Sequence, residues 1–124
     1  MHVLIATDSV HTTAAACGYL ESRLDPDDTV TVVSVSGPDA RDADDALNVA
    51  NARLLGYADV ETERIDDDGD PAPVIASAVD DHTPDLVLIG PHAGVSGAGP
   101  TLGRTARRLI ESVDVPVVVV PLSV

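Results

Sequence analysis

Residues 85–120 read DLVLIGPHAGVSGAGPTLGRTARRLIESVDVPVVVV, and this stretch decides the fold. An apolar run from Leu86 to Ile89 ends at Gly90 and is followed by a glycine-rich loop. Apolar residues then recur at helical spacing, at Leu102, Ala106, Leu109, Ile110 and Val113. The pattern predicts a strand, a loop, a helix and a final strand. Such a loop turns backbone amides and the positive end of the helix dipole toward a phosphate, although the same glycines would also suit a plain connection.

The residue types that are missing exclude several familiar chemistries. A Walker phosphate loop needs a lysine, but all seven basic residues of this chain are arginine. The loop from Gly90 to Gly103 is too long for the tight turn of a dinucleotide fingerprint. Ser9 and Ser96 lack the G-x-S-x-G elbow of a hydrolase, and the histidines lack the spacing of metal ligands. We therefore predict no catalytic residues and no metal site.

The remaining elements are predicted from periodicity and turn residues. Strands are expected at His2–Thr7, Thr29–Ser36 and Asp59–Ile65, and helices at Thr12–Leu24, Ala43–Leu54 and from Pro71 onward, with Asp70 as N-cap. The acidic third strand suits a sheet edge. Strands alternating with helices predict an α/β fold, a single doubly wound five-stranded parallel sheet with helices on both faces, Rossmann-like in architecture, over residues 1–124.

Over its whole length the chain resembles the universal stress protein (UspA-like) family, and two segments carry the resemblance most clearly. The sequence from Gly90 to Val120 is similar to that family's C-terminal signature, G-x-x-G, nine residues, G-[ST], a helix and a Pro-Val-rich strand. The start, VLIATDS, resembles the family's first strand and its adenine-contacting aspartate, here Asp8. The resemblance implies a nucleotide-binding α-hydrolase-like fold. Two positions depart from the motif, because Ala93 stands where the family has glycine and Arg104 where it has a small hydroxyl residue.

The resemblance also implies where a nucleotide would bind. The candidate nucleotide-binding residues are Thr7, Asp8, Val35, Ile89, Gly90, His92, Ala93, Gly94, Gly103, Arg104 and Thr105. From the residues alone, Asp8 could either contact the ligand or serve as the N-cap of the following helix. Arg104 could donate charge-assisted hydrogen bonds to a phosphate, or it could fill the space of a triphosphate. The Ala93 methyl group would obstruct close approach to the backbone.

These departures favour a stress-type binding and regulatory protein with weak or lost ATP binding and no catalysis. The alternative is an ATP-binding stress protein that hydrolyses ATP slowly or switches with it. No cofactor is expected, or ATP with Mg²⁺ if nucleotide binding is retained. A protein partner is implied by the family but is not identified by the residues.

The composition of the chain limits which binding partners and which cellular compartment are expected. The net charge of −14 would repel nucleic acid. The chain has no lysine and an excess of aspartate, which suggests a protein from a salt-adapted organism. The alternative is an ordinary acidic, soluble protein. The apolar runs are too short for a signal peptide or a membrane span. Cys17 is the single cysteine, so no internal disulfide can form. A cytoplasmic protein without a membrane partner is expected.

The final strand predicts a homodimer. Val117, Val118, Val119 and Val120 lie between Pro116 and Pro121. At a sheet edge, bare valines and unpaired backbone groups favour pairing with a second copy, and the prolines would confine that pairing to the valines. The resemblance implies a dimer of the same kind. Alternatively, a neighbouring helix or residues 122–124 could cover this edge.

Overall fold

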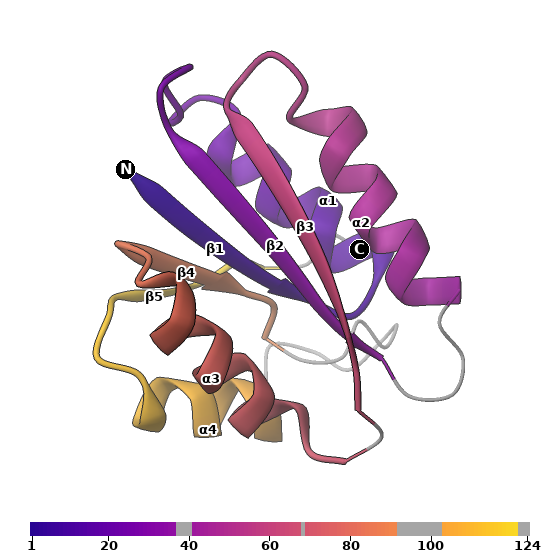
Figure 1. Cartoon of the computed structure of the whole chain (residues 1–124), viewed down its shortest axis with the longest axis vertical. Helices are drawn as coiled ribbons and strands as arrows, with labels where there is room; N and C mark the ends of the chain where they lie inside the picture. Colours follow the sequence, from indigo (N-terminus) through magenta and orange to yellow (C-terminus); the bar gives the residue numbers. More distant parts are fainter. Residues whose placement is uncertain (37–40, 68, 92–102, 122–124) are drawn as a thin grey trace.

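The computed structural model describes residues 1–36, 41–67, 69–91 and 103–121. The elements in chain order are β1 (His2–Thr7), α1 (Val10–Leu20), β2 (Thr29–Ser36), α2 (Arg41–Arg53), β3 (Asp59–Asp66), α3 (Pro71–His82), β4 (Leu86–Ile89), α4 (Arg104–Ser112) and β5 (Val117–Val119). In this part of the chain the five strands pair in the order β3-β2-β1-β4-β5, all parallel (Figure 1). The predicted doubly wound α/β fold is confirmed.

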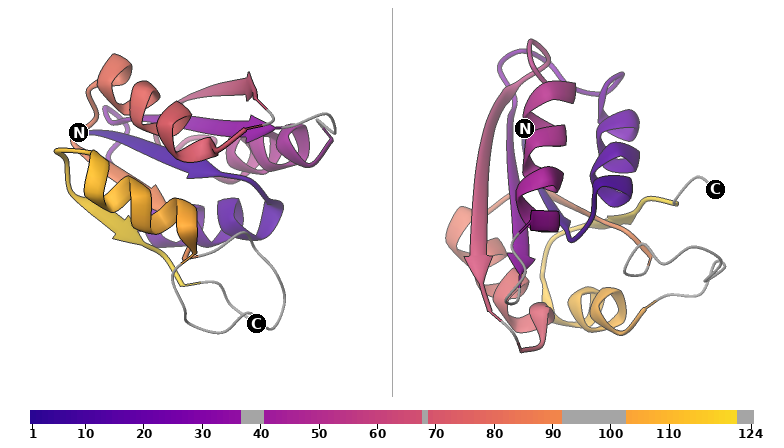
Figure 2. Two further views of the ribbon diagram at one scale, coloured as in Figure 1. Left: turned by 90° about the horizontal axis from the view of Figure 1, so that it is seen from below. Right: turned by 90° about the vertical axis from the view of Figure 1, so that its right-hand side faces the viewer.

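Helices cover both faces of the sheet. Helices α1 and α2 lie on one face and α3 and α4 on the other (Figure 2). Because side chains alternate along a strand, β1 sends Val3 and Ile5 into the first core and Leu4 and Ala6 into the second. The chain leaves β1 toward β2 on one side and later returns to β4 on the other. Ligands bind beyond the carboxyl ends of the strands at such a switch point.

The first helix begins and ends earlier than predicted. It spans Val10–Leu20 instead of Thr12–Leu24, and its N-cap is Ser9, whose Oγ accepts a hydrogen bond of 3.1 Å from the Thr12 amide. The interpretation of Asp8 as the N-cap is therefore wrong. The C-terminal error arose because Leu24 packs against the same core as the helix but does so from the following turn.

The edges of the sheet agree with the sequence patterns. Strand β3 is an edge strand, as its acidic residues predicted, and β5 is the edge at the other side. Strand β5 ends at Val119, one residue before the predicted end, and the buried Val120 still donates its amide to the Ile89 carbonyl at 2.8 Å. None of the helices in the described ranges is long and apolar enough to cross a membrane.

Candidate functional site

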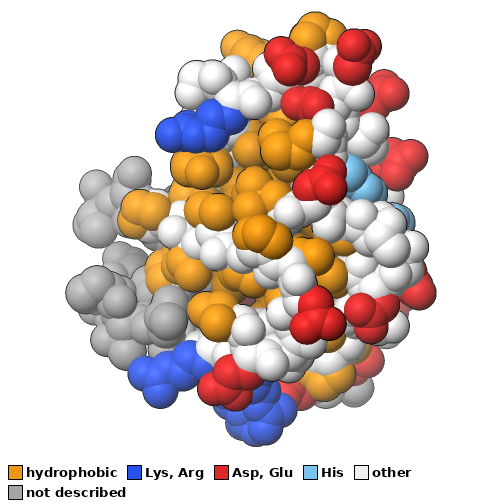
Figure 3. Space-filling view, turned by 90° about the vertical axis from the view of Figure 1, so that its left-hand side faces the viewer, with side chains coloured by type: hydrophobic (Ala, Val, Ile, Leu, Met, Phe, Trp, Pro, Cys, Tyr) orange, Lys and Arg blue, Asp and Glu red, His pale blue; other side chains and the backbone are white. Residues whose placement is uncertain are grey.

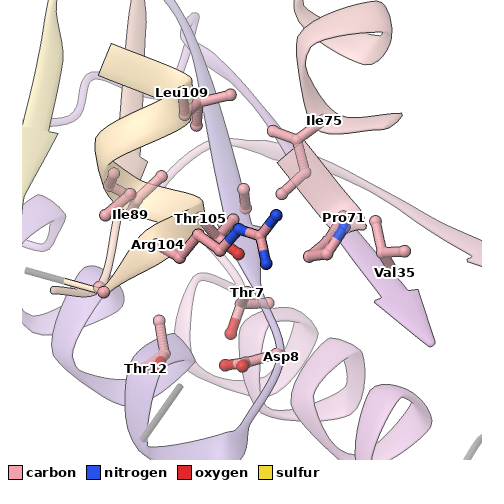
Figure 4. Close-up of a pocket in the computed structure, with 14 residues that line it drawn as sticks. Thr7, Asp8, Thr12, Val35, Pro71, Ile75, Ile89, Arg104, Thr105 and Leu109 are labelled. Atoms are coloured by element: carbon pink, nitrogen blue, oxygen red, sulfur yellow. The ribbon is translucent and has the colours of Figure 1, made fainter. Parts of the chain in front are cut away.

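A pocket of about 410 Å³ opens at the carboxyl ends of β1, β2 and β4 (Figure 4). Residues of α3 and of α4 line two facing sides of this pocket. The lining residues are Ala6, Thr7, Asp8, Thr12, Val35, Pro71, Ile75, Ile89, Gly90, Gly103, Arg104, Thr105, Ala106 and Leu109. The volume falls near the low end of the range of about 300–1,000 Å³ that is usual for small-molecule sites.

This pocket gathers the predicted nucleotide-binding residues that the structure describes. Those residues are Thr7, Asp8, Val35, Ile89, Gly90, Gly103, Arg104 and Thr105. His92, Ala93 and Gly94 lie outside the described residues. Their common position follows from the parallel sheet, which brings the ends of β1, β2 and β4 to one edge, where α4 begins. That they bind a nucleotide stays a prediction.

Sequence reasoning missed the wall formed by α3. Pro71 and Ile75 line the pocket from the first turns of this helix, opposite Leu109 of α4. The signal was present in part, because Asp70 and Pro71 were predicted as the helix start, and the structure confirms both positions. What the sequence did not reveal is that α3 and α4 pack side by side on the same face of the sheet.

The turn between β1 and α1 is fixed by hydroxyl groups. Thr7 Oγ1 and Thr13 Oγ1 lie 2.8 Å apart, and each lies 3.0 Å from the carbonyl oxygen of Ser9. Both threonines are buried. The Thr7 hydroxyl is thus engaged within the protein, and the next residue, Asp8, lines the pocket.

Arg104 reaches across the pocket from the start of α4. It is the first residue of the helix, and in Figure 4 its guanidinium points away from α4 toward Pro71. The N-cap, Gly103, has no side chain with which to cap the first-turn amides. Arg104 is exposed and makes no hydrogen bond or ion pair with another described residue. This end of the pocket therefore combines helix amides with a guanidinium, and both favour an anion.

A second arginine of α4 links the two walls. The Arg108 guanidinium donates a hydrogen bond to Asp70 Oδ2 and forms an ion pair with this carboxylate. Oδ1 of the same carboxylate accepts a hydrogen bond of 3.1 Å from the Ala72 amide. Asp70 therefore caps α3 and ties it to α4 at once. The partner of Arg108 is thus the N-cap of a helix that lies 38 positions earlier in the chain.

The polar side chains of the described lining are three threonines, one aspartate and one arginine. The lining holds the hydroxyls of Thr7, Thr12 and Thr105, but no described lining residue is a histidine or cysteine. The described ranges contain no group of three or more His, Cys, Asp or Glu side chains that could hold a metal ion. Cys17 is fully buried in the first core, and this burial raises the pKa of its thiol to about 11.

The fold and pocket together define an α/β domain with a pocket at the switch point of a parallel sheet. The family model of the universal stress protein family matches residues 1–121. The chain belongs to the universal stress protein family. No curated protein matches it significantly in sequence.

Solved structures share the fold at low sequence identity. The hypothetical protein MJ0577 superposes with a TM-score of 0.79 at 16% identity, covering 99% of this chain and 96% of that one. A universal stress protein in complex with cAMP gives 0.71 at 20% identity, covering 99% and 98%. A universal stress protein family protein from Arabidopsis thaliana with AMP bound gives 0.72 at 15% identity, covering 99% and 92%. At these identities the likeness establishes the fold.

Proposed function

We propose that the protein is a stress-type binding and regulatory protein and that its pocket binds a small adenine nucleotide. We propose further that the protein binds ATP only weakly and does not act as an enzyme. The observation that carries this proposal is the position of Arg104, which extends into a pocket of only about 410 Å³. A guanidinium in this place occupies room that a triphosphate would need. The cAMP and AMP complexes of two structural relatives support a nucleotide with a single phosphate as the ligand class.

The residues present fit ATP with Mg²⁺ poorly. Asp8 is the acidic side chain among the described lining residues, and no described cluster of carboxylates accompanies it. A magnesium ion would have to be held mainly by the phosphates themselves. In addition, Ala93 replaces a motif glycine that allows close approach of backbone. We therefore expect no resident cofactor.

Calorimetric titration with MgATP in concentrated KCl tests the proposal. The wild-type protein should bind ATP weakly, and the double variant Ala93→Gly/Arg104→Ser should bind it more tightly. Arg107→Ser is the matched control, because Arg107 is exposed on the same helix and does not line the pocket. Tight stoichiometric binding of ATP to the wild type would overturn the proposal and favour the slow hydrolase or ATP-dependent switch instead.

We further propose that two copies pair through β5. The strand is an edge of the sheet, its valines are half-buried, and the flanking Pro116 is exposed. Figure 3 shows hydrophobic side chains gathered on this side of the molecule, with acidic side chains toward its margins. Antiparallel pairing with a second copy would satisfy the open backbone groups and cover the valines.

We also propose that the protein works in a salt-rich cytoplasm. Of the chain's net charge of −14, much is carried by carboxylates that the structure finds exposed, including Asp42, Asp44 and Asp45 on α2. At molar salt the screening length falls to about 3 Å, which makes such a surface tolerable. The regulated protein partner is not identified by the pocket or by the surface charge.

A further inference from the structure

We propose that Arg104 is a specificity-determining residue that recognises one phosphate group, so that the pocket prefers a nucleoside monophosphate to both the uncharged nucleoside and the triphosphate. This inference rests on the proposed function, since it assumes an adenine nucleotide as ligand. It goes further by assigning a role to a residue that departs from the family motif.

The first argument is the electrostatic position of Arg104. It is the first residue of α4, where the helix dipole is positive and where cations are unfavourable. Gly103 offers these amides no side-chain cap, and Arg104 pairs with no other described residue. An anion placed between the amides and the guanidinium would accept hydrogen bonds from both. A bound phosphate thus relieves a local accumulation of positive charge that the described protein groups leave uncompensated.

The second argument is the number of cations. Arg104 is the single cationic side chain among the described lining residues. Arg108 lies one turn later on α4, but it is engaged with Asp70, and Arg107 does not line the pocket. One guanidinium matches one phosphate in a bidentate contact. A triphosphate would bring further negative charges, without matched cations, into a protein of net charge −14.

The third argument is the distribution of polar groups. Asp8 presents a carboxylate at the end of β1, and Arg104 presents its guanidinium from α4 (Figure 4). Apolar side chains of Val35, Pro71 and Ile75 lie beside them. A ligand with hydrogen-bond donors, an apolar ring and an anion complements this arrangement. A nucleoside monophosphate carries all three features within a small volume.

Titration of the wild-type protein with AMP, adenosine and MgATP at one fixed KCl concentration tests the inference. AMP should bind at least about tenfold more tightly than adenosine and than ATP, as one charge-assisted contact would give. Arg104→Gln should reduce AMP affinity to the level of adenosine while leaving adenosine binding unchanged. Arg107→Gln, the matched control on the same helix, should leave both affinities as in the wild type. Equal melting temperatures of the variants will show that folding is intact.

Three results would overturn the inference. The first is equal affinity of the wild type for AMP and adenosine; if ATP binding is nevertheless weak, the proposed function stands and only the role of Arg104 is lost. The second is an Arg104→Gln variant that retains the AMP preference. The third is no measurable binding of AMP, a result that would also refute the small adenine nucleotide as the ligand of the proposed function. Tight ATP binding by the wild type, in contrast, would refute the proposed function itself.

Discussion

Asp70 offers the sharpest test of how the pocket walls are held together. Its carboxylate caps α3 through the Ala72 amide at 3.1 Å and pairs with Arg108 of α4. Loss of an N-cap side chain costs about 1 kcal/mol, within a range of about 0.5–2. The ion pair is 48% exposed at Arg108 and 29% exposed at Asp70, so after solvent screening it contributes at most about 0.5 kcal/mol. The cap should therefore dominate.

Three substitutions separate the two contributions. Asp70→Ala removes both and should lower the free energy of unfolding by about 1–2 kcal/mol, or the melting temperature by roughly 3–8 °C. Asp70→Asn keeps a good N-cap and loses only the charge, so it should cost at most about 0.5 kcal/mol. Arg108→Gln should cost the same small amount, because the cap is untouched.

Denaturant unfolding at low and high KCl measures these differences. The small cost of Asp70→Asn should shrink further at high salt, whereas the difference between Asp70→Ala and Asp70→Asn should persist, because a cap to a backbone amide is less screened than an exposed ion pair. Asp80→Ala is the control, since Asp80 is an exposed carboxylate later in the same helix. If Asp70→Asn or Arg108→Gln proves as damaging as Asp70→Ala, the assignment of the stability to the cap is refuted.

Three further outcomes are expected. Melting temperatures should rise with KCl, because screening relieves repulsion in a chain of net charge −14, and equal values across the series would contradict this. Sedimentation at micromolar concentration and high salt should show a dimer that Val118→Asp converts to a monomer, and a wild-type monomer would rule out pairing through β5. Cys17 should resist iodoacetamide at pH 8 and react rapidly in denaturant, since a pKa of about 11 leaves only about one thiolate in a thousand at that pH, and rapid labelling of the folded protein would disprove its burial.

The fold could be predicted because local patterns and global topology agree. Apolar runs marked the buried strands, and the mixed acidic pattern of Asp59–Ile65 marked an edge, since a central strand of a parallel sheet has no exposed face for such residues. Asp70 and Pro71 were readable as a helix start because both act through nearby backbone geometry. The helix start depends on contacts within a few residues of the signal, and the edge strand could be predicted because its own side chains show how much of it is exposed.

The site could be predicted only where it follows from strand ends. Thr7, Asp8 and Ile89 belong to the carboxyl ends of neighbouring strands, so the sheet order alone brings them together. The Arg108 contact to Asp70 could not be foreseen, because it joins residues 38 positions apart and depends on how two helices pack. Ser9 was missed as a cap because Asp8 is an equally suitable residue type one position earlier.

The acidic surface and Arg104, the one arginine among the described lining residues, would act on an anionic ligand over different distances. The net charge of −14 repels any anion at long range, whereas the contact with a phosphate proposed for Arg104 would act only at short range. Salt screens the long-range repulsion first, because its screening length of about 3 Å at 1 M is close to the length of the hydrogen bond itself. A salt-rich solvent would therefore admit an anion to the pocket and still permit the contact with the guanidinium. The two features that depart most from an ordinary nucleotide-binding protein, the aspartate-rich surface and the arginine at the start of α4, are thus compatible with one ligand chemistry.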